Sequence, residues 1–116
     1  MDAAELRART KAFALRVIRL YRALPKFGEA QVIGNQLLRS ATSVGANYRA
    51  VCRCRTHAEF VSKMSIVLEE ADESLFWLEL LSEAQVMPSG RLAPVTKEAD
   101  ELVAIFAAAR KTARGS

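Results

Sequence analysis

No catalytic motif combines the side chains of this chain that could act as a nucleophile and a base. Ser40, Ser43, Cys52 and Cys54 are potential nucleophiles, and His57 is the only histidine in the sequence. Nucleophilic catalysis needs a base within hydrogen-bond reach, and no histidine lies along the helix from either serine. No glycine-rich phosphate loop is present either. We therefore expect a protein that is not an enzyme.

The residues that could bind a metal are also incomplete as a ligand set. A di-metal carboxylate site in a helical bundle needs paired Glu-x-x-His motifs, which a single histidine cannot supply. Cys52 and Cys54 with His57 are not the tetrahedral set that zinc requires. Two positions apart on a helix, the cysteines point about 200° apart and cannot bridge each other. We expect reduced thiols, with Cys52 near the core, and neither metal nor cofactor.

A more distinctive feature is a polar seam at helical spacing, which lies beside an apolar stripe and consists of Gln36, Ser40, Ser43 and Asn47. Three roles are compatible with it: exposure to solvent, hydrogen bonding to a neighbouring helix or subunit, and a ligand site. We expect the seam to fix packing geometry and to do no chemistry. Asn47→Ala or Gln36→Ala should then cost about 1–3 kcal/mol, if these groups leave buried partners unpaired.

Four apolar stripes with the periodicity of packed helices must position these side chains. They predict helices over residues 3–24, 30–53, 57–84 and 92–112. Pro25 ends the first helix, Thr56 with Glu59 forms a capping box before the third, and Pro94 suits the first turn of the fourth. Short connections place consecutive helices side by side and antiparallel. We expect one all-α domain, residues 1–116, folded as an antiparallel up-down-up-down four-helix bundle.

The third predicted helix carries two apolar faces. One is a seam for the core, formed by Met64, Leu68, Ala71, Leu75 and Leu78. The other is formed by Ile66, Trp77 and Leu80, and large apolar side chains on an outer face are typical of contacts between subunits. The second helix has two interior glycines, Gly34 and Gly45, each costing about 1 kcal/mol relative to alanine. This cost favours close approach of another backbone, and together these features predict a homo-oligomer.

Charge is unevenly distributed along the chain, whose net charge is +4. Residues 1–28 sum to +5, whereas residues 58–84 sum to −6. The basic side chains of the first two helices form a candidate nucleic-acid-binding patch, namely Lys11, Arg19, Arg22, Arg39, Arg49 and Arg53. Few aromatic residues lie among them, so base stacking is not supported and sequence preference should be weak. Alternatively, these cations pair with the acidic third helix of the same or a neighbouring subunit.

The distribution of apolar residues also bears on location. No apolar run approaches the roughly 18–20 residues that a membrane span needs. The first 24 residues contain six basic side chains and lack the uninterrupted apolar core of a signal peptide. We therefore expect a cytoplasmic protein with no membrane partner.

Residues 36–81 resemble a family of bacterial four-helix bundle proteins first noticed as open reading frames inside 23S ribosomal RNA intervening sequences. The resemblance rests on the runs QLLRSA and SVGANYR, on Glu59-Phe60, and on EEADES shortly before WLELL. It extends more loosely over most of the chain. Members commonly carry an acidic residue soon after the Asn-Tyr element, where this chain has Ala50 and Val51.

This resemblance implies a bundle that assembles into a ring-shaped homopentamer. The family is similar to the accessory variability proteins of diversity-generating retroelements, which are basic pentamers that bind nucleic acid and a reverse transcriptase. The resemblance thus implies an oligomeric accessory protein that binds RNA, DNA or a nucleoprotein, with a reverse transcriptase as partner in a retroelement context. The alternative is a protein-interaction scaffold that binds no nucleic acid.

Overall fold

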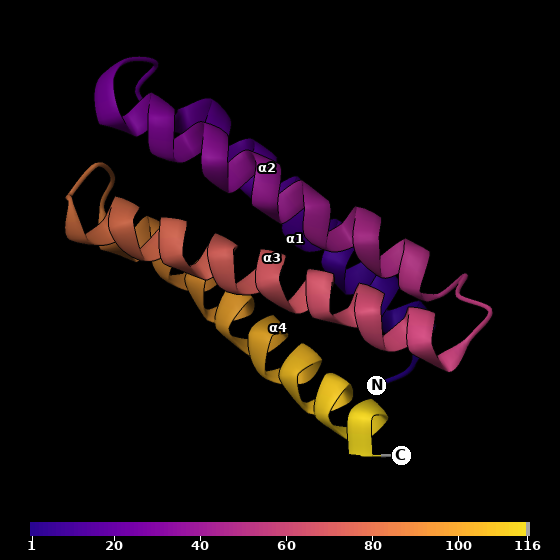
Figure 1. Cartoon of the computed structure of the whole chain (residues 1–116). Coiled ribbons are helices and arrows are strands. Elements are labelled where there is room, and N and C mark those ends of the chain that lie inside the picture. Colours follow the sequence, from indigo (N-terminus) through magenta and orange to yellow (C-terminus); the bar gives the residue numbers. More distant parts are fainter. Residues whose placement is uncertain (116) are drawn as a thin grey trace.

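Four α-helices make up the part of the chain that the computed structural model describes, residues 1–115; Ser116 lies outside it. They are α1 (Ala3–Ala23), α2 (Gly28–Val51), α3 (His57–Glu83) and α4 (Ser89–Gly115), and residues 1–115 contain no strand. Each helix runs antiparallel to the next, and both termini lie at the same end as the α2–α3 loop (Figure 1). The molecule is elongated, 44 × 21 × 19 Å. The predicted all-α four-helix fold is confirmed.

Local hydrogen bonds explain where the helices begin. The Asp2 carboxylate accepts from the backbone N–H of Glu5 at 2.8 Å, and the Thr56 hydroxyl accepts from that of Glu59 at 3.1 Å. Both satisfy N–H groups that have no partner inside their helix. Gly28 begins α2 two residues before the expected start, and its φ of 63° is one that glycine adopts without steric cost.

The fourth helix also starts earlier than expected, at Ser89 instead of residue 92. Pro94 is therefore the sixth residue of α4 and does not lie in its first turn. A proline at this position removes only one backbone hydrogen bond, the one that would reach Gly90. The chain turns into the helix before Pro94, because Arg91 donates its N–H to the carbonyl oxygen of Pro88 at 3.0 Å.

The core runs the length of the bundle and is formed by fully buried side chains that include Phe13, Leu37, Val44, Leu78 and Phe106. In α3 the buried face differs from the predicted seam. Met64, Ala71 and Leu78 are buried as predicted, but Leu68 and Leu75 are only half-buried. The face also buries Val67, Ser74 and Leu81, which the seam did not include. The reason is that α3 packs against both α2 and α4, so its buried face lies between the two contacts and Leu68 and Leu75 fall on the α4 side.

The helices pack mainly against their neighbours in sequence. The contacts of α2 with α3 and of α3 with α4 are extensive, whereas α1 meets α4 over a short stretch only. Arg9 bridges this open side: its guanidinium donates to both carboxylate oxygens of Glu98, at 2.7 and 2.8 Å, and to Glu101 at 2.8 Å. Within residues 1–115, no helix is long and apolar enough to cross a lipid bilayer.

The two interior glycines of α2 face α1, but they meet different neighbours. A Cβ at Gly45 would lie 3.5 Å from the carbonyl oxygen of Thr10, so another backbone does approach there, as expected. A Cβ at Gly34 would lie only 2.9 Å from the Cδ1 atom of Leu24. The first distance is an ordinary contact, and the second requires the leucine to move.

We therefore expect opposite outcomes for two alanine substitutions. Gly45→Ala should raise the free energy of unfolding by up to about 1 kcal/mol, because alanine is the better helix former. Gly34→Ala should gain less or lose stability, because Leu24 must shift. Urea unfolding of both variants and the parent measures the difference. A clear loss of stability in Gly45→Ala would contradict this account of the α1–α2 contact.

Candidate nucleic-acid interface

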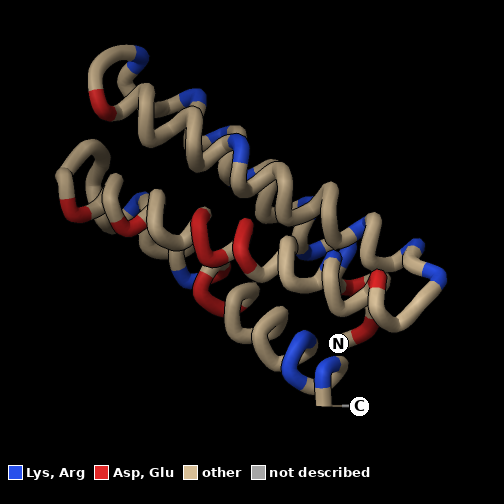
Figure 2. Tube along the Cα trace, viewed as in Figure 1, with Lys and Arg blue, Asp and Glu red and all other residues tan. Residues whose placement is uncertain are grey.

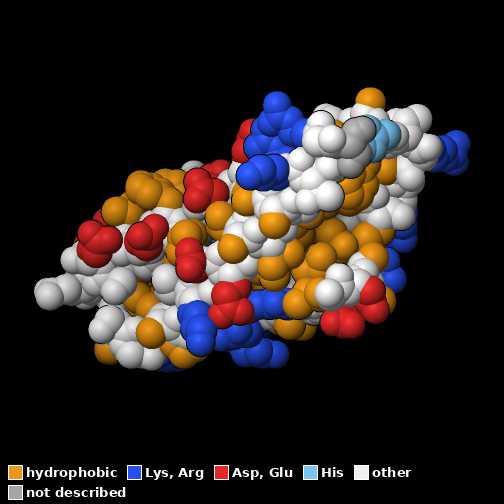
Figure 3. Space-filling model, turned by 90° about the horizontal axis from the view of Figure 1, so that it is seen from below, with side chains coloured by type: hydrophobic (Ala, Val, Ile, Leu, Met, Phe, Trp, Pro, Cys, Tyr) orange, Lys and Arg blue, Asp and Glu red, His pale blue; other side chains and the backbone are white. Residues whose placement is uncertain are grey.

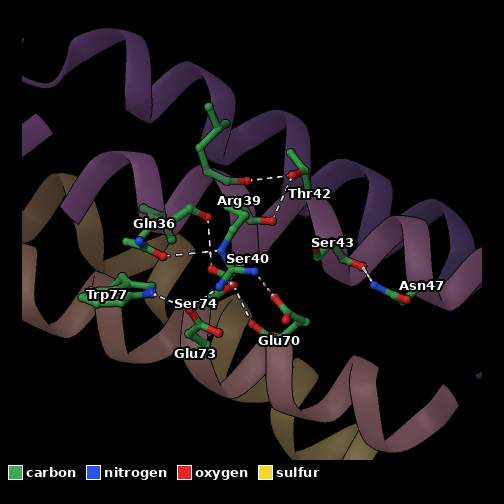
Figure 4. Close-up of polar contacts among 12 residues, drawn as sticks. Gln36, Arg39, Ser40, Thr42, Ser43, Asn47, Glu70, Glu73, Ser74 and Trp77 are labelled. Atoms are coloured by element: carbon green, nitrogen blue, oxygen red, sulfur yellow. Dashed lines mark hydrogen bonds and ion pairs between the residues drawn. The ribbon is translucent and has the colours of Figure 1, made fainter. Parts of the chain in front are cut away.

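A buried pair of hydroxyl groups links α2 to α3 (Figure 4). The Ser74 hydroxyl lies 2.9 Å from that of Ser40 and 2.8 Å from the carbonyl oxygen of Glu70. The Ser40 hydroxyl donates in turn to the carbonyl oxygen of Leu37 at 3.2 Å. Both serines are fully buried, and such a satisfied pair favours one register of the two helices. Ser40 is thus the residue of the polar seam that bonds across the helix interface.

Above this pair, Arg39 lies between two carboxylates of α3 (Figure 4). It forms an ion pair with Glu70 at 3.2 Å and a second, closer one with Glu73. Glu73 also accepts a hydrogen bond from the Trp77 indole N–H at 3.2 Å. Arg39 was expected in the nucleic-acid-binding patch, but its charge is compensated by the acidic helix of its own chain. For Arg39, the structure therefore agrees with the alternative expectation that these cations pair with the acidic third helix of the same chain.

The other members of the polar seam lie in different environments. Gln36 is exposed, and its side-chain oxygen lies 3.4 Å from Nε of Arg39. Asn47 is half-buried and donates to the carbonyl oxygen of Ser43 at 2.9 Å, within α2 itself. Water can replace both contacts, so the cost of about 1–3 kcal/mol expected for Gln36→Ala and Asn47→Ala does not follow from their surroundings. A cost of this size is instead expected for removing one hydroxyl of the buried pair Ser40 and Ser74, because its partner would be left unpaired.

The Arg39 ion pairs predict a dependence of stability on pH. The hydrogen bond from Arg39 lowers the pKa of Glu73 below its ordinary value of 4.5. A carboxylate whose pKa is lower in the folded state stabilises that state above pH 4.5, and this stabilisation is lost as the pH falls through the lowered pKa. Arg39→Gln should cost at most about 1 kcal/mol near neutral pH, because the Arg39 side chain is 49% exposed and solvent screens its ion pairs. The difference from the parent should vanish in acid.

Thermal unfolding of parent and Arg39→Gln between neutral and acidic pH measures this effect. Arg19→Gln is the matched control, since Arg19 is exposed and forms no ion pair among residues 1–115. A difference between parent and Arg39→Gln that stays constant down to acidic pH would contradict the role of Glu73.

A groove between α1 and α2 gathers basic side chains that have no acidic partner among residues 1–115. Its volume is about 630 Å³, and its rim carries Arg7, Lys11, Arg49 and Arg53, all exposed. Within residues 1–115, none of these four cations lies within 4.0 Å of a carboxylate oxygen. The remaining lining is small and mostly uncharged: Ala8, Ala14, Thr42, Gly45, Ala46 and Cys52. The groove is therefore a region of positive potential lined by small side chains between its basic residues.

The groove contains half of the basic residues expected to form the patch. Lys11, Arg49 and Arg53 are brought together, whereas Arg19 and Arg22 are exposed and do not line it. Arg7 completes the groove and was not among the predicted residues. It precedes Lys11 by four positions and so shares its helix face, a spacing that could have identified it. Figure 2 shows basic segments along α1 and α2 and acidic ones mainly on α3 and α4.

The two cysteines differ in their surroundings. Cys52 is exposed in the wall of the groove and does not lie near the core as expected. The reason is that α2 ends at Val51, which takes the last buried position, so Cys52 caps the helix outside the core. Cys54 is half-buried and donates to the carbonyl oxygen of Ala50 at 3.4 Å, and burial raises the pKa of its thiol. Cys52 is thus the more accessible thiol.

The expected oligomer contact on α3 is apolar but only partly exposed. Ile66 is 40% exposed, while Trp77 and Leu80 are half-buried. Phe76, which the sequence reasoning missed, is 50% exposed and packs edge-on against Trp77 with ring centroids 5.0 Å apart. The apolar face therefore includes an aromatic pair. Its role as a subunit contact stays a prediction.

Comparisons with known proteins bear on the family. The model of the family described as 23S rRNA-intervening sequence protein matches residues 4–108, which is most of the chain. The chain belongs to this family. The resemblance inferred from the sequence is thereby confirmed. No curated protein matches this chain.

A solved structure is similar to this chain over almost its whole length. It is the crystal structure of a protein with unknown function from the S23 ribosomal protein family of Bacteroides thetaiotaomicron VPI-5482. The two chains share 29% sequence identity with a TM-score of 0.84, and the match covers 96% of this chain and 99% of the other. This likeness therefore supports the fold of the chain and assigns it no function.

Proposed function

We propose that this protein is a non-enzymatic, oligomeric accessory protein that binds the phosphate backbone of RNA or DNA in the groove between α1 and α2. The observation that carries the proposal is the set of four basic side chains on the rim of this groove, Arg7, Lys11, Arg49 and Arg53, which have no acidic partner among residues 1–115. Arginine and lysine in such a groove neutralise phosphates and release counterions.

The lining of the groove also supports a mode of binding. It contains no aromatic side chain, so bases have no surface to stack on. Contacts to phosphates position a nucleic acid but carry no direct sequence information. We therefore expect binding that is sensitive to salt and largely insensitive to sequence.

The proposal includes assembly into a homo-oligomer, with a ring-shaped homopentamer as the form that the family resemblance implies. The support from this chain is the apolar face of Ile66, Phe76, Trp77 and Leu80. An oligomer presents several copies of the groove, so weak individual sites gain through avidity. Light scattering tests this part, and a monomer of 12.8 kDa would contradict it. A reverse transcriptase is a further partner if the protein acts in a retroelement.

One observation favours a second function, a protein-interaction scaffold without nucleic acid. A groove of about 560 Å³ between α3 and α4 is lined by Glu79, Glu83 and Asp100, with Lys97 as its one basic residue. Its charge is opposite to that of the α1–α2 groove. The acidic groove of one subunit could therefore bind the basic groove of a neighbouring subunit and neutralise it. In that case no groove cations would remain for phosphates.

Binding of labelled single-stranded RNA and duplex DNA, followed by fluorescence anisotropy, separates the two functions. Affinity should fall steeply between about 50 and 200 mM salt, the behaviour of phosphate contacts. Bound RNA should also protect Cys52 from alkylation, with Cys54 as internal reference, because only Cys52 lines the groove. Absence of binding at the lowest salt would reject the nucleic-acid function and favour the scaffold.

A further inference from the structure

The C-terminal part of α4 carries a second basic groove, which shares no lining residue with the first. It lies between α3 and α4, has a volume of about 430 Å³, and is lined by Leu68, Ala107, Arg110, Lys111, Arg114 and Gly115. All three of its ionisable side chains are cationic, and none lies within 4.0 Å of a carboxylate oxygen of residues 1–115. Figure 3 shows basic side chains on the same edge of the molecule as the single histidine.

Arg110 is distinctive among these cations. Its Nε atom is buried and has no hydrogen-bond partner among residues 1–115. A buried donor without an acceptor costs free energy, and each such group in a folded protein calls for an explanation. Because the guanidinium is partly removed from water and uncompensated, its attraction for an anion is stronger than that of a fully exposed cation.

The helix end that carries this groove is held in place. The imidazole Nε2 of His57, at the start of α3, lies 2.9 Å from the carbonyl oxygen of Ala113 in the last turn of α4. This hydrogen bond ties the groove cations to α3. The C-terminus of a helix carries only about half a negative charge, which a lysine and two arginines more than offset. The groove therefore retains a net positive charge.

We infer that this groove is a second anion site, which binds phosphate groups of a polyanion independently of the α1–α2 groove. The arginine side chains supply planar donors suited to phosphate oxygens, and Lys111 adds a point charge. Leu68 and Ala107 supply apolar surface beside the cations. The ligand class is oligophosphate. The inference rests on the proposed function only where it identifies RNA or DNA as the natural polyanion.

Titration with inorganic tripolyphosphate, followed by the backbone amide resonances of the whole protein, tests the inference. The expected result is two sets of shifted resonances, one in α1 and α2 and one at residues 107–114. Lys111→Gln with Arg114→Gln removes two exposed cations and leaves Arg110 in place, so the fold should be retained. This variant should weaken binding at the α4 site about tenfold and leave the α1–α2 set unchanged.

A second variant, Arg49→Gln with Arg53→Gln, should do the reverse. The inference is overturned if residues 107–114 do not respond to tripolyphosphate, or if their response survives in Lys111→Gln/Arg114→Gln. Either result leaves the proposed function standing, because that function is decided by RNA binding and Cys52 protection at the other groove. Loss of RNA binding with a retained tripolyphosphate response at α4 would reject the proposed function alone.

Discussion

Replacing the four groove cations with glutamine, Arg7→Gln/Lys11→Gln/Arg49→Gln/Arg53→Gln, should remove most of the salt dependence of RNA binding. Each phosphate contact of a single strand contributes a slope of about −0.7, so four contacts give about −2.8. The affinity of the parent should then fall about 50-fold between about 50 and 200 mM salt. The variant should bind weakly and nearly independently of salt over this range. Fluorescence anisotropy with labelled single-stranded RNA measures both slopes.

The control for this experiment changes charge on the same helix but outside the groove. Arg19→Gln/Arg22→Gln alters two exposed arginines of α1 that do not line it. A double groove variant, Arg49→Gln/Arg53→Gln, removes the same amount of charge from the rim. If the two doubles reduce the slope equally, binding depends on net charge and the groove is not the site. A larger effect of the groove double locates the phosphate contacts between α1 and α2.

The largest expected effect on stability is that of Phe106→Ala. Phe106 is fully buried in α4, and its ring centroid lies 5.6 Å from that of Tyr48 in α2. Truncation removes buried apolar surface and leaves a cavity, at a cost of about 3–5 kcal/mol. A domain of this size has about 5–15 kcal/mol in total, so the variant should lose a large share of its stability. Urea unfolding measures the loss.

Phe27→Ala is the matched control, because it deletes the same side chain at a site that is 76% exposed. Its cost should be within about 0.5 kcal/mol, as for other surface substitutions. If Phe106→Ala lost no more stability than the control Phe27→Ala, the contact between Phe106 and Tyr48 would not be part of a close-packed core. Similar m-values in the parent and both variants are needed for the comparison to hold.

The periodicity of apolar residues predicted the fold well because four long helices leave a strong heptad signal. It was less accurate for the first residues of helices, which local backbone geometry determines. Gly28 starts α2 early through its positive φ, and Ser89 starts α4 five residues before Pro94. The buried face of α3 was predicted only in part, because a helix with two neighbours buries a wider arc than a single seam indicates.

The candidate site was predictable only in part. Helix periodicity places Lys11 on one face of α1 and Arg49 and Arg53 on one face of α2, but it does not determine how the two helices are rotated against each other. That rotation brings the three together with Arg7. The packing of α2 against α3 likewise turns Arg39 toward Glu70 and Glu73, contacts that join residues more than thirty positions apart. Pairings of this kind depend on the register of two helices, which a single sequence does not encode locally.

The short contact between α1 and α4 has a consequence for how the protein opens. Because α2 and α3 each pack against two neighbours, while α1 and α4 each rely mainly on one, the two inner helices should form the most cooperative unit. Amide hydrogens of α1 and α4 should exchange with solvent through partial opening, and those of α2 and α3 only near global unfolding. Such opening would separate the rim of the α1–α2 groove, so a ligand that bridges both helices would slow exchange in α1 most.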